Sequence, residues 1–369
     1  FDRAAVLVMD GVGEWATTSY GVGKGSELTL IDEIRFPHSL GMLYSAFTYY
    51  LGFKVNDGEY KVMGMAPYGE PKFTDLIRKN LIEIRDDGSF HLNMNYFNYC
   101  TGLTMTNDRF ASLFGGPRRD LSEPLSQRHM DLARSIQDVL EDAVLLLVRH
   151  LHEKTGEKNL CLAGGVALNC VANGRISREG PFDNIWIQPA AGDAGGSLGA
   201  ALALWHNEMK NERKVFNYDQ MQGSYLGPEF SQKEIETNLK QSGAIFDVMN
   251  EEDLLDKTAE DLSNGNAIGW FQGRMEFGPR ALGARSILGD PRSETMQKDL
   301  NLKVKYRESF RPFAPSVLID DASKWFDINE ESPYMLLVSN VNKNKQLKMN
   351  DEQKKLFGIN KLNVKRSEI

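Results

Sequence analysis

The chain has few cysteines and no long apolar runs. Its 369 residues include three cysteines, Cys100, Cys161 and Cys170, whose spacing fits neither a zinc site nor a disulfide framework. This usage favours a reducing compartment, so we expect a cytoplasmic protein. No apolar run approaches the ~20 residues of a membrane-spanning helix, and no secretory signal is visible. The chain starts at Phe1 within an expected strand, and we therefore expect further residues upstream of it.

Positive charge is also scarce in the chain as a whole. Lys and Arg total 43 against 51 Asp and Glu, and the net charge is −8 at pH 7. This balance argues against a general nucleic-acid binder. The segment from Gly269 to Ser316 differs, because it holds nine Lys or Arg and five Asp or Glu. A local basic segment in an acidic chain favours a small anionic ligand over a polymer.

Two common catalytic patterns are missing. A glycine-rich turn followed by Gly-Lys-Ser or Gly-Lys-Thr does not occur, which excludes a P-loop protein. No Ser-His-Asp or Cys-His arrangement suggests a covalent nucleophile. His150 and His152 are two residues apart on an expected helix, so they point to different faces and make a poor metal pair.

Alternating apolar runs and helical periodicities predict an α/β fold. The clearest helix covers residues 127–154, where apolar residues recur at helical spacing before a stop at Gly156. We also expect strands at residues 4–9, 15–21, 27–36 and 267–271, and helices at 39–51, 200–209, 231–241, 252–264 and 296–302. Residues 72–116 are weakly patterned and predict one short helix and two strands. The polar stretch 211–222 predicts a domain boundary.

The segment from Asn159 to Leu204 contains two apolar runs that each end in glycines before a helix. Such turns place bare N–H groups and a helix N-terminus at one point, which suits an anion or a nucleotide. Gly164, Gly165 and Asn169 could approach a nucleoside closely. The alternative interpretation is a tight strand-to-helix connection.

Two aspartates stand at the ends of expected strands. Asp10 follows a buried strand and precedes Gly11 and Gly13, and Asp193 lies between glycines at a helix start. Carboxylates in such positions can hold a divalent metal or a metal-bound water at a phosphate. The alternatives are a turn aspartate for Asp10 and a helix N-cap for Asp193.

Arginines cluster among Gly, Phe and Pro residues in the basic segment. Arginine forks bind phosphate or carboxylate bidentately, so we interpret this cluster as an oxyanion site. The alternative is a structural salt-bridge network with Glu276 and Glu308. The basic candidates are Arg274, Arg280, Arg285, Lys305, Arg307 and Arg311, with Ser286 beside them.

Six segments together resemble the O-carbamoyltransferases of the NodU/CmcH/TobZ type. They are residues 10–14 (DGVGE), 58–64 (GEYKVMG), 163–169 (AGGVALN), 189–195 (PAAGDAG), 277–286 (FGPRALGARS) and 307–315 (RESFRPFAP). The joint pattern is specific and spans residues 4–334. The third segment alone would indicate only the wider actin-like ATPase superfamily.

The resemblance implies two domains. Residues 1–210 would form a Kae1-like domain with the actin-like ATPase (ribonuclease H-like) fold, lacking its N-terminal part. Residues 211–222 would be a linker, and residues 223–369 a YrdC-like α/β domain lacking its C-terminal part. In this family, carbamoyl phosphate and ATP give a carbamoyl-adenylate at the YrdC-like domain. The carbamoyl group then passes to a hydroxyl of a sugar-like or antibiotic acceptor at the Kae1-like domain.

The resemblance also assigns roles to residues. Asp10 and Asp193 would bind a divalent metal, Fe or Mg, whose histidine ligands are expected upstream of residue 1. The catalytic residues would be Asp10, Lys61, Arg280 and Arg307. ATP would contact Gly11, Gly13, Gly164, Gly165, Asn169 and Gly192. Carbamoyl phosphate and the nucleotide phosphates would contact Arg274, Arg280, Arg285, Ser286, Lys305, Arg307 and Arg311.

Two other functions compete with the carbamoyltransferase hypothesis. A sugar kinase or another actin-like phosphotransferase explains Asp10 and the glycine turns but not the basic segment. A component of tRNA threonylcarbamoylation is disfavoured by the acidic charge. The partners we expect are carbamoyl phosphate and a small-molecule hydroxyl acceptor, with no nucleic acid, no membrane and a homodimer as the assembly to test. Without the segments expected beyond both ends, this stretch alone should not turn over.

Overall fold

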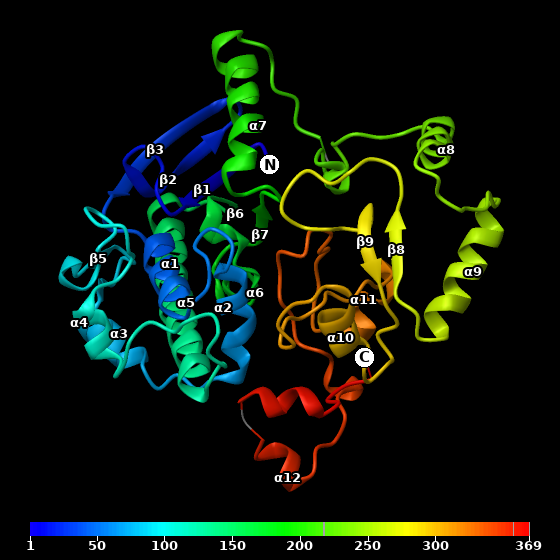
Figure 1. The fold of residues 1–369 in the computed structure, drawn as a ribbon. Coiled ribbons are helices and arrows are strands. Elements are labelled where there is room, and N and C mark those ends of the chain that lie inside the picture. Colours follow the sequence, from blue (N-terminus) through cyan, green and yellow to red (C-terminus); the bar gives the residue numbers. More distant parts are fainter. Residues whose placement is uncertain (217, 357, 369) are drawn as a thin grey trace. The chain divides into compact units, whose positions relative to one another are not determined.

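A computed structural model describes residues 1–216, 218–356 and 358–368, and the chain divides into two compact units (Figure 1). The first unit comprises Phe1–Val215, Leu336–Ser339 and Met349–Val364. The second comprises Phe216–Met335, Asn340–Lys348 and Lys365–Ile369. The first unit therefore takes in two short segments from the part of the chain that the sequence assigned to the second domain.

A five-stranded mixed sheet organises the first unit. Its strands are β1 (Arg3–Met9), β2 (Ala16–Lys24), β3 (Glu27–Arg35), β6 (Asn159–Ala163) and β7 (Asn184–Ile187), in the order β3-β2-β1-β6-β7. β2 is antiparallel to β1 and β3, whereas β1, β6 and β7 are parallel. β1 lies at the centre, and its residues Ala5, Leu7 and Met9 are buried. The predicted strands at 4–9, 15–21 and 27–36 are confirmed.

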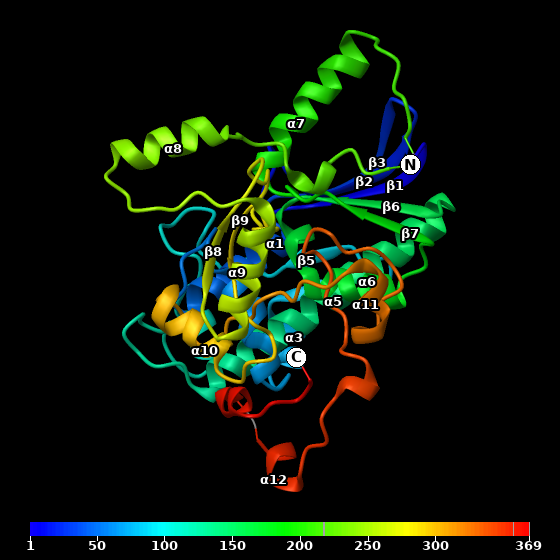
Figure 2. The same cartoon turned by 90° about the vertical axis from the view of Figure 1, so that its right-hand side faces the viewer.

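Helices cover one face of this sheet (Figures 1 and 2). They are α1 (Leu40–Tyr50), α2 (Glu59–Met65), α5 (Gln127–Thr155) and α6 (Cys170–Glu179). α5 contacts β1, β2 and the three other helices, as its long apolar face requires. It ends where predicted, because Gly156 adopts φ +64°, a left-handed conformation that glycine takes without strain.

The weakly patterned region forms a small subdomain of the first unit. It contains α3 (Thr74–Asn80), β4 (Ile82–Ile84), β5 (Phe90–Leu92) and α4 (Asp108–Leu113). The predicted short helix and two strands are confirmed, and α4 and α2 are additional helices that the sequence analysis did not assign. Edge-on and tilted ring contacts of Phe110 and Phe114 with Phe47 and Tyr50 attach α4 to α1.

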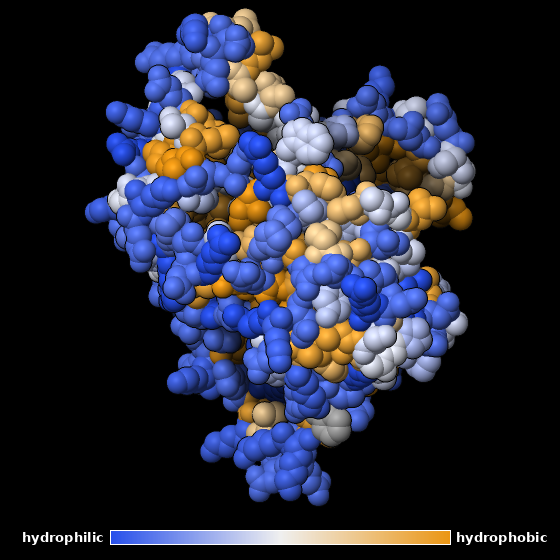
Figure 3. Space-filling view, turned by 90° about the vertical axis from the view of Figure 1, so that its left-hand side faces the viewer, coloured by the Kyte–Doolittle hydropathy of each residue, from blue (hydrophilic) through white to orange (hydrophobic). Residues whose placement is uncertain are grey.

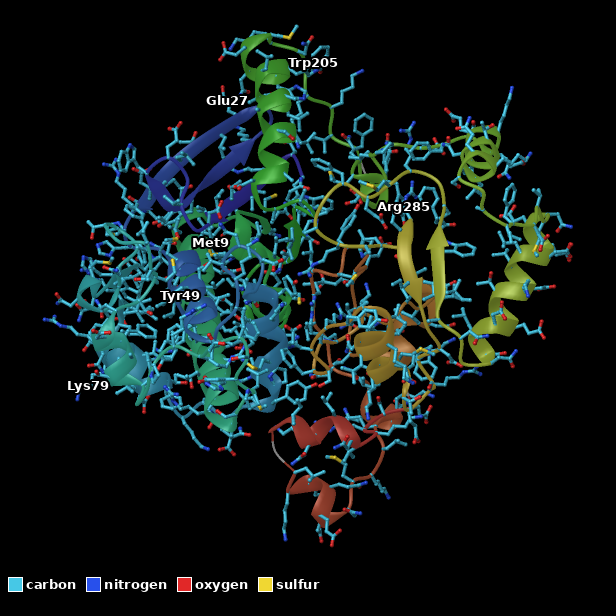
Figure 4. All side chains as sticks on the ribbon, viewed as in Figure 1. Met9, Glu27, Tyr49, Lys79, Trp205 and Arg285 are labelled. Carbon is cyan, nitrogen blue, oxygen red and sulfur yellow. The ribbon has the colours of Figure 1, made fainter. Side chains whose placement is uncertain are left out.

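α7 (Asp193–Ala203) lies on the side of the sheet opposite α1 and α5 (Figures 1 and 2). None of its residues is buried, although most are apolar or small. It continues as a π-helical turn, Leu204–Glu208, which carries the half-exposed Trp205 (Figure 4). Elsewhere on the surface, hydrophobic side chains gather in patches between hydrophilic ones (Figure 3).

The second unit has a smaller core. Its elements are α8 (Gln232–Gln241), α9 (Glu251–Ser263), β8 (Ile268–Phe271), β9 (Arg285–Leu288), α10 (Met296–Asp299) and α11 (Ile319–Trp325). β8 and β9 form an antiparallel pair that places Phe271 opposite Arg285. Phe310, Leu300 and Tyr334 are buried. The short helix α12 (Asp351–Lys354) belongs to the first unit. No helix among the described residues has both the length and the apolarity to cross a membrane.

Candidate active site

Asp10 joins two loops at the carboxyl edge of the sheet. Its Oδ1 accepts hydrogen bonds from the backbone N–H of Gly11 at 2.7 Å and of Gly165 at 3.3 Å. The second bond is possible because β1 and β6 are parallel neighbours, so the loops that follow them meet at one edge. The sequence analysis singled out both residues, and the structure brings them together.

Close backbone packing fixes the position of Asp10. Gly164 has φ +88°, and a Cβ there would lie 2.1 Å from the Met9 carbonyl oxygen. A Cβ on Gly41 would lie 2.6 Å from the Asp10 carbonyl oxygen. These two glycines therefore let the β6 loop and the start of α1 approach the end of β1. The N-cap of α1, Ser39, places its Oγ 2.9 Å from the Asp10 carbonyl oxygen.

Asp193 lies at the same edge, in the loop after β7. The backbone N–H of Gly164 donates to the Ala191 carbonyl at 2.8 Å, which places the β7 loop against the β6 loop. The interpretation of Asp193 as the N-cap of α7 is wrong, because Gly192 occupies that position and Asp193 begins the helix. The carboxylate of Asp193 is exposed.

A metal centre does not follow from this arrangement by itself. Asp10 and Asp193 supply carboxylate oxygens of the kind that Mg²⁺ or Fe²⁺ can use. Across residues 1–216, 218–356 and 358–368, however, no three His, Cys, Asp or Glu side chains are grouped to hold a metal ion. Two carboxylates are fewer ligands than such a cation takes, so the metal stays a prediction.

A cavity of about 480 Å³ opens beside Asp10. Its wall includes Glu14, Trp15, Glu33 and Arg35 from the β1–β2 turn and from β3. Glu33 and Arg35 form an ion pair at 2.6 Å, and Trp15 is 70% exposed. Among the described residues, none donates a hydrogen bond to Oδ2 of Asp10. This oxygen is therefore the one available to a ligand in the cavity.

Asn169 belongs to a buried polar network. It caps α6 by accepting from the Ala172 N–H at 3.0 Å, and its amide exchanges two 3.0 Å hydrogen bonds with Gln137. Gln137 also accepts from the Tyr44 hydroxyl and donates to Glu141. Burial raises the pKa of Glu141 and of Tyr44. The sequence did contain a signal for this network, because Gln137 and Glu141 interrupt the apolar face of α5 at helical spacing.

In the second unit, Glu276 organises the loop between β8 and β9. The buried carboxylate accepts from the backbone N–H groups of Leu282 at 2.7 Å, Ala284 at 2.8 Å and Arg285 at 3.3 Å. Burial alone would raise its pKa, but these backbone hydrogen bonds outweigh burial and lower it. Glu276 therefore shapes the arginine-bearing loop through main-chain contacts.

Glu276→Gln should lower the free energy of unfolding of the protein by about 1–2 kcal/mol at pH 7, because charge-assisted hydrogen bonds become neutral ones. The lowered pKa means that the wild-type carboxylate stabilises the fold above the ordinary glutamate pKa. That contribution disappears as pH falls through the folded-state pKa. Urea unfolding at neutral and acidic pH measures the difference. Glu294→Gln, an exposed site in the same unit, is the control, and equal effects of the two substitutions would contradict the prediction.

Arg285 and Arg274 are engaged by the loop itself. The Arg285 guanidinium stacks on Phe271 at 3.4 Å and donates to the carbonyls of Gln272, Gly273 and Ala284. Arg274 lies 3.6 Å from Glu229 and donates to a neighbouring carbonyl. Ser286 Oγ accepts from the Gly283 N–H at 2.9 Å. Arg280 is half-buried in the same loop. The ligand-binding roles of these residues stay predictions.

Lys305, Arg307 and Arg311 form a cationic cluster. Partial desolvation, followed by the charges of Arg307 and Arg311, lowers the pKa of Lys305, although its side chain is exposed. Arg307 is fixed by a 2.6 Å hydrogen bond to Asn301 Oδ1 and by stacking on Phe313 at 4.6 Å. Glu308 lies 3.8 Å from Arg311. Three cations held together at an energetic cost are typical of a site that binds an anion.

Comparison with known proteins identifies the family. A family model described as the carbamoyltransferase N-terminus matches residues 1–202, and one described as the carbamoyltransferase C-terminus matches residues 259–355. The chain belongs to the carbamoyltransferase family. The N-terminal carbamoyltransferase model covers the sheet edge that carries Asp10 and Asp193. The C-terminal model covers the segment with Glu276 and the cationic cluster.

Relatives of this carbamoyltransferase-family chain occur in several bacteria. It is 63% identical over 371 residues to the uncharacterized protein sll1178 of Synechocystis sp., covering all of this chain and 60% of that protein. Nodulation protein NolNO of Sinorhizobium fredii is 39% identical over 94% of the chain and 49% of the relative. Nodulation protein NolO of Bradyrhizobium diazoefficiens is 37% identical over 92% of the chain and 60% of the relative. The chain thus spans about half to three fifths of these curated relatives.

Proposed function

We propose that the protein is an O-carbamoyltransferase that uses carbamoyl phosphate and ATP. The observation that supports this most is the match of one chain to both the N-terminal and the C-terminal carbamoyltransferase models. In this proposal the first unit has the actin-like (Kae1-like) fold and the second the YrdC-like fold. The parallel β1-β6-β7 core, with its functional carboxylates at one edge, supports the first assignment.

The second unit would activate the carbamoyl group. Overall, carbamoyl phosphate, ATP, water and an alcohol R–OH give R–O–CO–NH₂, AMP, pyrophosphate and phosphate. Water would first cleave carbamoyl phosphate into carbamate and phosphate. A carbamate oxygen would then attack the α-phosphate of ATP, and pyrophosphate leaves. The cluster of Lys305, Arg307 and Arg311 would hold the anionic groups against their mutual repulsion. Arg280 would serve the same purpose from the loop that Glu276 organises.

The first unit would transfer the carbamoyl group. Hydrogen bonds to Oδ1 orient the carboxylate of Asp10, and Oδ2 would accept the proton of the acceptor hydroxyl as its oxygen attacks the carbamoyl carbon. AMP leaves with the electrons of the broken C–O bond. Gly11, Gly164, Gly165 and Gly192 would let the nucleotide approach the backbone. A divalent metal at Asp10 and Asp193 would supply Lewis-acid chemistry.

The test is exchange of labelled pyrophosphate into ATP by the whole protein, with and without carbamoyl phosphate and without any acceptor. We expect exchange that depends on carbamoyl phosphate, because adenylate formation is reversible. Adding hydroxylated acceptors should then give a product heavier by one carbamoyl group. Absence of exchange under all conditions contradicts the proposal, and a phosphorylated product would indicate a phosphotransferase instead.

A further inference from the structure

A second cleft, of about 690 Å³, lies along α1 in the first unit. Met42 and Tyr49 both line it and are seven residues apart, so they share one face of the helix about 10 Å apart along its axis. Tyr49 is labelled in Figure 4. Met42 also adjoins the catalytic turn, because a Cβ on Gly11 would lie 3.9 Å from its Sδ. Met42 therefore lies between this cleft and the turn that carries Asp10. Its volume is typical of small-molecule sites.

The walls of this cleft are mainly aromatic and apolar. Phe53 is buried at its base, whereas Leu103 and Leu121 are 105% and 71% exposed. Leu103 is at the tip of a loop that Asn98 holds in place. The Asn98 side-chain amide donates to Thr104 Oγ1 at 2.8 Å, and the Asn98 backbone N–H donates to the Met105 carbonyl at 3.0 Å. Two exposed leucines beside an aromatic cleft provide apolar surface that a bound ligand would cover.

The charge at the cleft is positive. Arg118 stacks on the Tyr49 ring at 4.2 Å, and its Nε donates to the Tyr49 carbonyl at 2.7 Å, so its position is fixed before any ligand binds. Lys54 adds an exposed ammonium group. None of the described residues that line the cleft is acidic. A polycationic ligand would meet repulsion here, whereas a carboxylate or sulfate would meet a fixed guanidinium.

We propose that this cleft binds the acceptor, and that the acceptor is a neutral or anionic hydroxylated ring compound carrying an apolar group, such as an alkyl or aryl glycoside. The inference rests on the proposed carbamoyl transfer, since Met42 separates the cleft from the turn that carries Asp10. The half-buried Tyr49 and Tyr99 offer aromatic surface that a sugar ring can contact, and the leucines contact the apolar part. The positive rim excludes polyamine acceptors.

Binding by the whole protein tests the ligand class. The probes are phenyl β-D-glucoside, phenyl β-D-glucuronide and the polycation kanamycin, measured by saturation-transfer NMR and calorimetry. We expect both phenyl glycosides to bind, with the glucuronide tighter. Arg118→Glu should weaken glucuronide binding by at least about tenfold, whereas Arg109→Glu, outside the cleft, should leave it unchanged. Tighter binding of kanamycin, or binding of neither glycoside, overturns the proposal.

A second variant guards against misfolding and separates the two proposals. Leu103→Asp changes a fully exposed side chain, so the fold should be retained, and Leu28→Asp, 56% exposed on β3, is its matched control. Leu103→Asp should weaken binding of both glycosides several-fold and leave carbamoyl-phosphate-dependent pyrophosphate exchange unchanged. Equal binding by Leu103→Asp and wild type overturns the cleft assignment. If the wild type binds the glycosides but shows no pyrophosphate exchange, the carbamoyl-transfer function is refuted and the cleft remains a glycoside-binding site.

Discussion

Replacement of Asp10 by Asn should lower kcat/KM for carbamoyl transfer by about 10²–10⁴-fold. The Asn side-chain oxygen can still accept the two backbone N–H groups that orient Oδ1 of Asp10, so the loop geometry is kept. The amide group that replaces Oδ2 cannot accept the proton of the acceptor hydroxyl. Pyrophosphate exchange, which needs no acceptor, should stay near the wild-type rate. The measurement is initial rates of transfer and of exchange on the same preparation.

The control for Asp10→Asn is Glu33→Gln, because Glu33 lines the same 480 Å³ cavity but pairs with Arg35. We expect the control to change transfer less than threefold. A large loss in both variants would mean that the cavity needs negative charge in general. Full transfer activity in Asp10→Asn would contradict a role of this carboxylate in the reaction.

Replacement of Lys305 by Met should reduce pyrophosphate exchange by about 10²–10³-fold, because it removes one of three cations that hold the anionic groups. The folded protein should not lose stability. The lowered pKa of Lys305 indicates that its charged form is disfavoured in the fold, so removing the charge relieves a desolvation penalty as well as repulsion from Arg307 and Arg311. Loss of activity without loss of stability is the pattern expected of a binding residue.

The pH dependence gives Lys305 a further signature. As pH rises through its lowered pKa, the ammonium group loses its proton and anion binding should weaken below the ordinary lysine pKa. Repulsion from Arg307 and Arg311 destabilises the fold while Lys305 is protonated, at pH values below its lowered pKa. The repulsion is relieved as pH rises above that lowered pKa. Lys303→Met, which removes an exposed lysine paired with Asp299, is the control. An exchange rate and pH profile equal to wild type in Lys305→Met would refute the assignment.

Much of the first unit could be predicted from the sequence because its elements carry strong local patterns. β1 is a continuous apolar run at the centre of the sheet, and α5 has a sustained apolar face and a glycine stop. The aspartate and glycine turns were predicted for the same reason, since each follows a buried strand. That Asp10 bonds to Gly165 depends on the parallel pairing of β1 and β6, which sequence order alone does not fix.

Other features depend on contacts between distant residues and were not predicted. α2 and α4 have short, mixed sequences, and neighbours such as Phe47 and Tyr50 decide the packing of α4. Composition could not show that Glu276 binds backbone N–H groups instead of the nearby arginines. Asn169 likewise pairs with Gln137, 32 residues away. In each case a polar side chain could take several partners, and the tertiary fold selects one.

Because Leu336–Ser339 belongs to the first unit, the order of chain synthesis affects when that unit can complete its contacts. The Asn173 amide donates to the Leu336 carbonyl at 3.0 Å, and the Val338 N–H donates to the Cys170 carbonyl at 3.1 Å, so α6 acquires partners more than 160 positions later. When residues 1–215 have left the ribosome, α6 still lacks these partners, and residues 216–335 of the second unit must emerge before they arrive. The first unit is therefore completed only after most of the second unit has been synthesised, and cutting the chain after Val215 would leave α6 without its final contacts.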